Sequence, residues 1–280
     1  MARPDSATLP DPLPLRLGCR PVMSDYQRRG AVVTGANRGI GKAIALAFLR
    51  AGWPVVALAR SSESLDALRR EAGQLAPRIR AMVCDLSDLA QLESAAQALA
   101  DAEPAPAVLV NNAGITVSAP LQKTGTADLL RVLQVNTVAP YVLCRALIPR
   151  MAEAGGGRVV NLGSIASLKG IRYTSAYCAS KHALLGLTRA LAVEWGKKGV
   201  TVNAVCPGWT ETDMFSRALD AVVEKTGRSP AEARSAVLAT NPMGRAVQPD
   251  EVAALVLYLS SPEAAGLTGA ALPVDSGESA

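Results

Sequence analysis

A run of β-branched residues leads directly into three closely spaced glycines and then into an alanine-rich stretch without a helix breaker. The run ends at Thr34, and the stretch after the glycines continues through Phe48. This order predicts a strand, a tight turn and a helix. Gly35 would permit the turn, Gly39 would let a phosphate approach the backbone, and Gly41 would let helix and strand pack closely.

The first turn of that predicted helix would present free N–H groups and a partial positive charge, which suit a pyrophosphate. The glycine spacing is G-x-x-x-G-x-G rather than the G-x-G-x-x-G of the common dinucleotide-binding fingerprint. The alternative is a glycine-rich turn that binds no ligand.

The rest of the chain alternates short apolar runs with helical patterns. Strands are predicted over residues 31–34, 54–59, 79–84, 107–110, 158–161, 201–205 and 272–274. Helices are expected to begin near Ile40, Ser64, Leu89, Thr126, Ser175 and Pro249, with an irregular helical insert over 211–239. The fold class is therefore α/β, a single-domain Rossmann-type doubly wound parallel sheet of about seven strands with helices on both faces. Ligands of such sheets bind beyond the carboxyl ends of the strands.

Composition fits one ordinary globular domain. The chain has 280 residues, of which 49% are hydrophobic and 19% charged, and the net charge is +5. Basic residues are scattered and few aromatic residues accompany them, so we expect no nucleic-acid partner. No stretch looks long and apolar enough to span a bilayer, so we expect no membrane partner.

The cysteines and the single histidine leave little material for a metal site, and we expect none. The five cysteines are odd in number and widely spaced, without a C-x-x-C pair. Together with the absence of a signal-peptide pattern, they indicate reduced thiols and a cytoplasmic location.

The first 29 residues do not share the pattern of the rest. Five prolines fall within residues 1–21, where no helical or strand period is visible. We therefore expect residues 1–29 to be a disordered or dispensable extension, with translation starting at Met23, and residues 30–280 to be the domain. An organelle-targeting segment is the alternative, although Asp5 and Asp11 interrupt its basic residues.

Tyr177 and Lys181 stand four residues apart, which places a phenol and an ammonium on one face of a helix. A phenol titrates near pH 10, so work at neutrality needs a drop of about three pKa units, or ~4 kcal/mol. A cation about 4 Å away supplies roughly that amount at an effective dielectric near 20. The pair therefore suits a proton donor and acceptor for a reacting oxygen. The alternative is two unrelated helix residues, which a Tyr and a Lys at this spacing usually are.

Further motifs follow in order along the chain: Asp85-Leu86, Asn111-Asn112-Ala113-Gly114, Asn136, Ser164, and Pro207-Gly208 followed by Thr212. Together with the glycine turn and the Tyr-x-x-Ser-Lys segment, they resemble the short-chain dehydrogenase/reductase family over about residues 30–277. The resemblance implies an oxidoreductase that moves a hydride between a nicotinamide cofactor and a carbonyl or alcohol carbon, which would make the chain an enzyme.

The resemblance also assigns catalytic roles. Tyr177 would be the general acid in ketone reduction and the base in reverse, and Lys181 would lower its pKa and hydrogen-bond the nicotinamide ribose. Ser164 would steady the substrate oxygen as negative charge develops. Asn136 would hold a water that links Lys181 to solvent.

By the same resemblance, a larger set of residues would bind the cofactor. Asp85 and Leu86 would contact the adenine, and the Asn112–Gly114 backbone would line the ribose and nicotinamide. The full set is Gly35, Asn37, Arg38, Gly39, Ile40, Gly41, Arg60, Asp85, Leu86, Asn112, Ala113, Gly114, Tyr177, Lys181, Pro207, Gly208, Thr210 and Thr212.

The second predicted strand favours NADPH over NADH. Ala59 stands where a carboxylate would bind the adenosine ribose hydroxyls of NAD, and Arg60 follows directly. Arg60 and Arg38 could clamp a 2′-phosphate bidentately. Two solvated surface arginines are the alternative.

Substrate identity is the least constrained part of the sequence. Residues 209–247 should form a lid, and the pattern around them looks closest to β-ketoacyl reductases, which implies a β-ketoacyl thioester or related ketone. Arg217, Arg228, Arg234 and Arg245 could meet a CoA or phosphopantetheine phosphate, or could be solvated. The alternatives are a dehydrogenase of a small or alicyclic secondary alcohol or hydroxyacyl-CoA, and, more remotely, a non-catalytic cofactor-binding regulator. A homotetramer is the assembly that the resemblance implies, with a dimer as the alternative.

Overall fold

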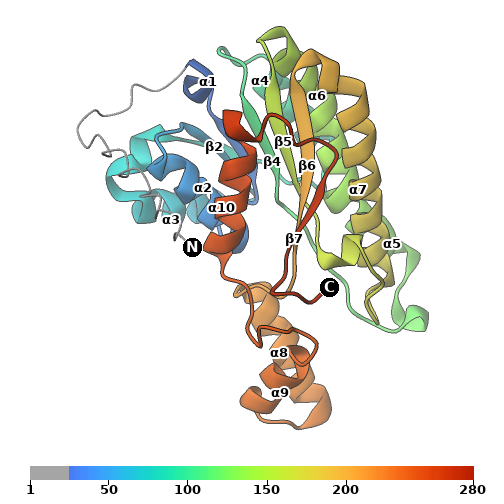
Figure 1. Ribbon diagram of the computed structural model, residues 1–280. Helices are drawn as coiled ribbons and strands as arrows, with labels where there is room; N and C mark the ends of the chain where they lie inside the picture. Colours follow the sequence, from blue (N-terminus) through green and yellow to red (C-terminus); the bar gives the residue numbers. More distant parts are fainter. Residues whose placement is uncertain (1–24) are drawn as a thin grey trace, which may run out of the picture.

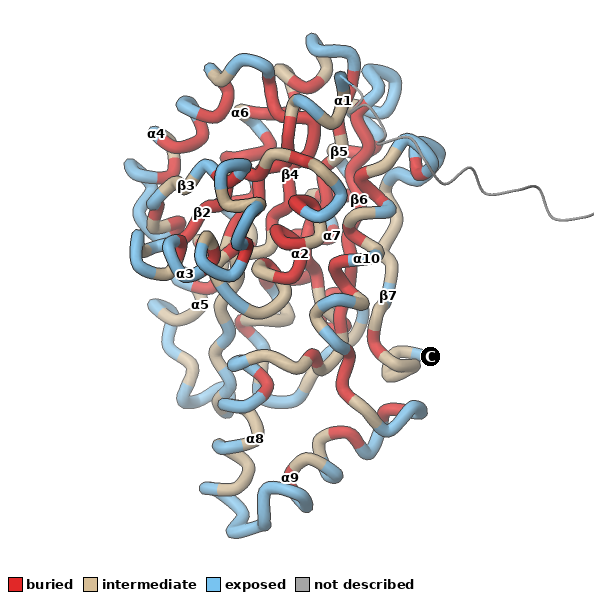
Figure 2. The backbone as a smooth tube through the Cα atoms, turned by 90° about the vertical axis from the view of Figure 1, so that its left-hand side faces the viewer, coloured by how far each residue is buried: buried red, intermediate tan, exposed pale blue. Residues whose placement is uncertain are grey.

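Seven parallel strands form one sheet in the order β3-β2-β1-β4-β5-β6-β7 (Figure 1), in a computed structural model that describes residues 25–280. Each predicted strand is present, and the bounds are β1 Ala31–Thr34, β2 Val55–Ala59, β3 Ile79–Val83, β4 Val108–Asn111, β5 Gly157–Leu162, β6 Val200–Pro207 and β7 Ala271–Val274. The central strands are buried throughout because helices cover both faces (Figure 2). The predicted fold class is confirmed.

Two helical layers pack on the sheet. The helices of the first are α2 (Gly39–Arg50), α3 (Ser62–Ala72) and α10 (Pro249–Leu259), and those of the second are α4 (Leu89–Ala100), α6 (Ala139–Glu153) and α7 (Ser175–Trp195). Each layer has its own core, and the first is centred on Ile44, Phe48 and Val256, whereas the second is centred on Leu92, Leu143 and Leu147. The doubly wound arrangement follows from right-handed crossovers on either side of β1 and β4.

The helix expected near Thr126 begins there and runs on into a second helix. Helix α5 (Thr126–Leu133) continues through a π-helical turn at Gln134–Val138 into α6, without a break. By length and composition the resulting 28-residue stretch could cross a membrane, so the expectation that no stretch is long and apolar enough was wrong. Half of its apolar window is buried inside the fold, however, where α6 packs on α4 and β5, as the core helix of a globular domain does.

The expected N-terminal extension lies mostly outside the described residues, and so does Met23. Its last residues do not follow the expectation, because Asp25–Arg28 forms a short helix, α1, packed on the domain. The Tyr26 ring meets Trp53 edge-on at 5.6 Å, and Arg29 Nε donates to the Ala105 carbonyl at 2.9 Å. Residues 25–29 therefore contact the domain through Tyr26 and Arg29.

Residues 209–247 leave the sheet edge as a separate helical unit (Figure 1). It contains α8 (Asp213–Thr226) and α9 (Pro230–Val237), which pack mainly on each other around Phe215 and Leu238. A bridge between Thr210 and Val247 joins the two ends of the unit.

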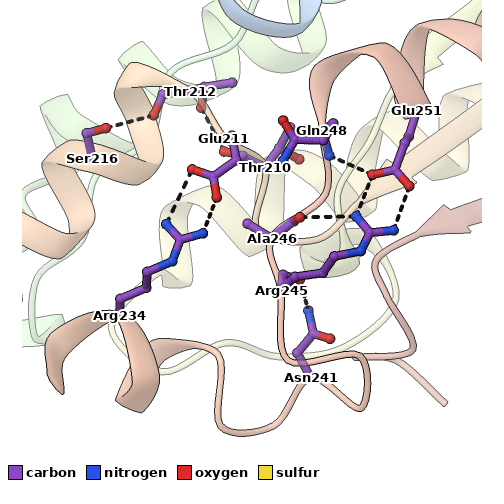
Figure 3. A network of polar contacts seen from close by, with 10 residues as sticks. All are labelled: Thr210, Glu211, Thr212, Ser216, Arg234, Asn241, Arg245, Ala246, Gln248 and Glu251. Atoms are coloured by element: carbon purple, nitrogen blue, oxygen red, sulfur yellow. Dashed lines mark hydrogen bonds and ion pairs between the residues drawn. The ribbon is translucent and has the colours of Figure 1, made fainter. Parts of the chain in front are cut away.

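Two arginine–glutamate ion pairs stabilise the part of this unit that lies next to the sheet (Figure 3). Arg234 pairs with Glu211, and Arg245 makes two 2.7 Å hydrogen bonds to Glu251 at the start of α10. Two of the four arginines that could have met a substrate phosphate are therefore engaged within the protein.

Candidate active site

The glycine turn between β1 and α2 forms a cradle that side chains would fill. Gly35 and Gly39 have φ values of +63° and +51°, in the left-handed region that favours glycine. A Cβ on Gly41 would stand 2.1 Å from the Gly35 carbonyl oxygen and 2.3 Å from Asn112 Nδ2. Within the described structure, the N-cap residue Arg38 makes no side-chain capping bond. The first N–H groups of α2 are thus open to an anionic ligand.

Replacing Gly41 by Ala is therefore expected to destabilise the protein by about 1–3 kcal/mol and to weaken dinucleotide binding, because the new methyl group overlaps backbone. Gly186→Ala in α7 is the matched control, since its Cβ would meet nothing within 4 Å in the described structure. That change should stabilise by about 0.5–1 kcal/mol. Denaturant unfolding of both variants tests the pair, and equal effects would contradict the account.

The Asn112–Gly114 segment is held next to the glycine turn by hydrogen bonds to Thr34, the last residue of β1. Asn112 Nδ2 donates to the Thr34 carbonyl at 2.8 Å, and the Thr34 hydroxyl accepts from the Asn112 and Ala113 amides at 3.0 Å each. Gly114 lies where a Cβ would be 3.4 Å from Asn136 Oδ1 and 3.5 Å from Lys181 Nζ. The structure thus brings the predicted phosphate and nicotinamide segments together at one edge of the sheet.

The predicted adenosine end gathers beyond β2 and β3. Arg60 and Arg38 are exposed, and Leu86 is buried. Hydrogen bonds from Ser87 lower the pKa of Asp85, and the charge of Arg60 adds a smaller lowering. Ile40 and Asn37 are half-buried within the glycine turn and the first turn of α2.

Arg38 has a neighbour that the sequence did not suggest. Its guanidinium lies 3.7 Å from the carboxylate of Asp213, the first residue of α8. Both side chains are more than half exposed, so this ion pair is weak. It nevertheless places the start of the helical unit beside the glycine turn.

Helix α7 carries the predicted catalytic pair, and the loop after β5 carries Ser164. Lys181 is buried, and its Nζ donates to the Leu162 carbonyl at 2.6 Å and lies 5.6 Å from the centre of the Tyr177 ring. Ser164 lies near enough to the Tyr177 phenol to lower its pKa. The three side chains therefore meet in one place, as predicted.

The expected lowering of the phenol pKa is not found in this structure. Burial raises the pKa of Tyr177 to about 12, and the nearby Ser164 side chain opposes that rise only in part. Burial also lowers the pKa of Lys181 to about 8. The prediction weighed the attraction between phenolate and ammonium and left out the loss of water around both groups, which dominates here.

The lowered pKa of Lys181 has a consequence for stability. At pH 7 the folded protein holds a buried ammonium that water would solvate in the unfolded chain, so Lys181→Met should stabilise the fold by up to about 3 kcal/mol. Between pH 8 and 10.5 the folded lysine loses its proton before the unfolded one does, so this advantage should shrink as pH rises. Unfolding at pH 7 and 10 tests this, with exposed Lys197→Met as control; a pH-independent difference would contradict it.

Asn136 lies in the π-helical turn, where its side chain bridges two segments. Its Oδ1 accepts from the Ile115 amide at 2.9 Å, and its Nδ2 donates to the Ile115 carbonyl at 2.9 Å and the Ser180 hydroxyl at 3.0 Å. The π-helical turn thus carries a side chain that contacts both the loop after β4 and helix α7. Asn136 thus fixes the loop after Gly114 against the catalytic helix.

Pro207 ends β6, and the next residues run along the site. A Cβ on Gly208 would lie 2.9 Å from Asp275 Cβ, so only glycine fits there. Thr210 Oγ1 donates to the Gly208 carbonyl at 3.0 Å, and Thr212 Oγ1 to the Thr210 carbonyl at 3.1 Å. The Thr212 methyl group lies beside Gly39, so this segment reaches the glycine turn.

One side chain beside this segment was missed by the sequence interpretation. The carboxylate of Glu278 stands next to Gly208, at a position where no motif or spacing marked it. The contact between Gly208 and Glu278, which are far apart in the sequence, is visible only in the folded structure.

The fold and the site together define a nicotinamide-dependent oxidoreductase class, and comparison with known proteins gives the family. Residues 35–279 match a family model described as enoyl-(acyl carrier protein) reductase. D-threitol dehydrogenase of Mycolicibacterium smegmatis is 36% identical over 88% of this chain and 91% of that protein. The chain belongs to the short-chain dehydrogenase/reductase family, and it is an oxidoreductase acting on CH–OH or C=O groups.

Two further relatives point to keto reduction. A 3-oxoacyl-[acyl-carrier-protein] reductase of Thermotoga maritima is 34% identical over 88% of this chain and 96% of that protein. The crystal structure of an actinorhodin polyketide ketoreductase with NADPH superposes with a TM-score of 0.85 at 34% identity, covering 92% of this chain and 99% of that one.

Proposed function

We propose that this protein is an NADPH-dependent ketoreductase that converts a ketone into a secondary alcohol. The main support is that three side chains lie together at the carboxyl ends of the strands: Ser164, Tyr177 and Lys181. A protein that only binds a cofactor has no chemical need for all three. The polyketide ketoreductase with NADPH and the 3-oxoacyl-[acyl-carrier-protein] reductase support it.

The residues present fit a dinucleotide. The glycine cradle leaves room for a pyrophosphate against the open amides of α2, and Gly114 places no side chain beside Asn136 and Lys181. Arg38 and Arg60 would bind the 2′-phosphate, since Ala59 offers no carboxylate to repel it. Asp85 and Leu86 would border the adenine, and Pro207, Thr210 and Thr212 the nicotinamide and pyrophosphate. When bound, the nicotinamide supplies the hydride.

Tyr177 holds the proton that the alkoxide oxygen needs. With a pKa of about 12 the phenol stays protonated at neutral pH, so it can donate to the substrate oxygen as negative charge develops. Ser164 positions that oxygen by a second hydrogen bond. Lys181, held by the Leu162 carbonyl, would bind the cofactor ribose, and Asn136 would hold the water that resupplies the proton.

We assign the substrate first to β-ketoacyl thioesters and related ketones, with residues 209–247 as the lid. Arg217 and Arg228 form no ion pair within the described residues and are free to meet a substrate phosphate, whereas Arg234 and Arg245 are engaged. A dehydrogenase of small secondary alcohols is the second candidate, because D-threitol dehydrogenase is among the relatives.

Initial rates of NADPH and NADH oxidation against a ketone panel test the function. The panel holds acetoacetyl-CoA, a β-ketoacyl thioester mimic, a decalone and cyclohexanone. Turnover of a thioester with NADPH is expected. Turnover of simple ketones alone would remove the thioester assignment, and no turnover of any ketone with either cofactor would contradict the function.

We also propose a cytoplasmic homotetramer. Exposed apolar side chains gather on the α5–α6 stretch, at Leu130, Val138 and Tyr141, and Val193 is exposed on α7. Such side chains favour burial against other copies of the chain. The four described cysteines are free thiols, which fits a reducing compartment. Light scattering should give a mass four times that of one chain, and a monomer would contradict the assembly.

A further inference from the structure

Ser164 is followed by a single helical turn, η4 (Ile165–Ser167), that determines how its hydroxyl can act. The backbone of Ser164 is extended, and its Oγ accepts a hydrogen bond from the Ala166 amide at 3.1 Å. Because this amide takes up one acceptor position of the hydroxyl, the hydroxyl hydrogen can be donated to a reacting oxygen. The nearby Ser164 side chain lowers the pKa of Tyr177, which is the direction that a donor gives.

Both backbone polar groups of Ser164 bind the same residue, Ser167. The Ser164 amide donates to Ser167 Oγ at 3.2 Å, and the Ser167 amide donates to the Ser164 carbonyl at 2.8 Å. Ser167 is 2% exposed, so its hydroxyl has little access to water. The position of Ser164 beyond the end of β5 therefore depends on Ser167.

Ser167 is in turn packed against the sheet, in space that a glycine leaves open. A Cβ on Gly163 would lie 2.9 Å from Ser167 Oγ and 3.0 Å from the Sγ of Cys206, a buried residue of β6. The Gly163 amide donates to the Val205 carbonyl of β6 at 2.7 Å. The Ser167 hydroxyl thus lies where β5 ends beside β6, and it connects Ser164 to the sheet.

We propose that Ser167 is a positioning residue for carbonyl reduction, which keeps the Ser164 hydroxyl aimed at the reacting oxygen. Without the Ser167 hydroxyl, the partly buried Ser164 amide loses its partner in the turn, and the turn gains by rotating that amide toward water. Such a rotation moves the Ser164 hydroxyl, and small displacements of a catalytic group lower the rate strongly. The inference rests on the proposed ketone reduction and deepens it by adding a residue that acts only through Ser164.

The test compares Ser167→Ala with the parent in NADPH-dependent reduction of the best ketone of the panel. The kcat should fall by about 5- to 100-fold, the loss expected when a buried amide is left without a partner. The KM for NADPH should stay within about twofold, because Ser167 lies outside the glycine turn. Ser167→Thr and Ser167→Val form a second pair of nearly equal volume that differs in the hydroxyl, so the Thr variant should be faster by a similar factor.

A double-mutant cycle with Ser164→Ala separates positioning from a general structural role. In the Ser164→Ala background no hydroxyl remains to be aimed, so Ser167→Ala should change the remaining kcat by less than about twofold. Ser260→Ala is the matched control, because Ser260 is also buried and its hydroxyl bonds a backbone group, the Val256 carbonyl, at 2.8 Å. Its kcat should equal that of the parent, and thermal unfolding of every variant reports the fold.

Three results would overturn the role of Ser167: a Ser167→Ala enzyme within twofold of the parent, Thr and Val variants of equal kcat, or the same loss with and without the Ser164 hydroxyl. Each of them leaves the ketoreductase function intact, because the parent still reduces the ketone. If the parent reduces no ketone at all, both proposals fail.

Discussion

Replacing Tyr177 by Phe is expected to lower kcat for ketone reduction by about 10²- to 10⁴-fold, the usual contribution of a positioned general acid. Only the phenol hydroxyl is removed, so the ring keeps its place on α7 and its packing near Lys181. NADPH affinity should stay within about threefold, because Tyr177 is one contact among many. Steady-state rates and a fluorescence titration of NADPH measure the two effects.

A matched control comes from the same active-site region. Tyr173 lies in the loop between Ser164 and α7, half exposed, with Arg172 stacked over its ring at 4.7 Å. Tyr173→Phe removes the same hydroxyl and should leave kcat within about twofold. A Tyr177→Phe enzyme within tenfold of the parent would overturn the assignment of the proton donor.

Removing both cofactor-selecting arginines is expected to have the second large effect. The double variant Arg38→Ala, Arg60→Ala should raise the Kd for NADPH by about 10²- to 10⁴-fold, since each guanidinium–phosphate contact is worth about 1.5–3 kcal/mol. The Kd for NADH should change little, because NADH lacks the 2′-phosphate that both arginines would bind. Isothermal titration with both cofactors gives the ratio.

Asp213 offers the opposite control. Its carboxylate lies 3.7 Å from Arg38, so it competes with a phosphate for the same guanidinium. Asp213→Asn should leave NADH binding unchanged and tighten NADPH binding by a few-fold at most, because the ion pair is exposed. If the arginine variants weaken NADH and NADPH equally, both arginines are surface residues and the choice of NADPH is wrong.

Much of the fold could be predicted because strong local signals coincide with the global arrangement. β1, α2 and the glycine turn lie where periodicity and glycines placed them, whereas β6 runs past its predicted end at Val205 to Pro207. The course of the chain from α5 into α6 was harder, because the π-helical turn at Gln134–Val138 has no breaker in its sequence. Helix α1 was missed because its stability comes from Tyr26 packing on Trp53 rather than from local pattern.

The candidate site was predictable where one short segment carries the geometry, as in the helix that holds Tyr177 and Lys181. Contacts between distant segments were not. The pairing of Arg38 with Asp213 and the approach of Glu278 to Gly208 depend on how the lid and residues 275–280 fold back on the sheet. The pKa directions were also beyond sequence, since burial of Tyr177 and Lys181 outweighs the attraction between them.

Isotope transfer distinguishes direct hydride transfer from NADPH to a ketone carbon from other routes of cofactor oxidation. The enzyme is incubated with NADPH that carries deuterium on both positions of C4 of the nicotinamide, together with the best ketone of the panel, and the product is analysed by mass spectrometry. We expect one deuterium on the carbinol carbon of the alcohol in every turnover. An alcohol without deuterium, or NADPH consumed without alcohol, would contradict it.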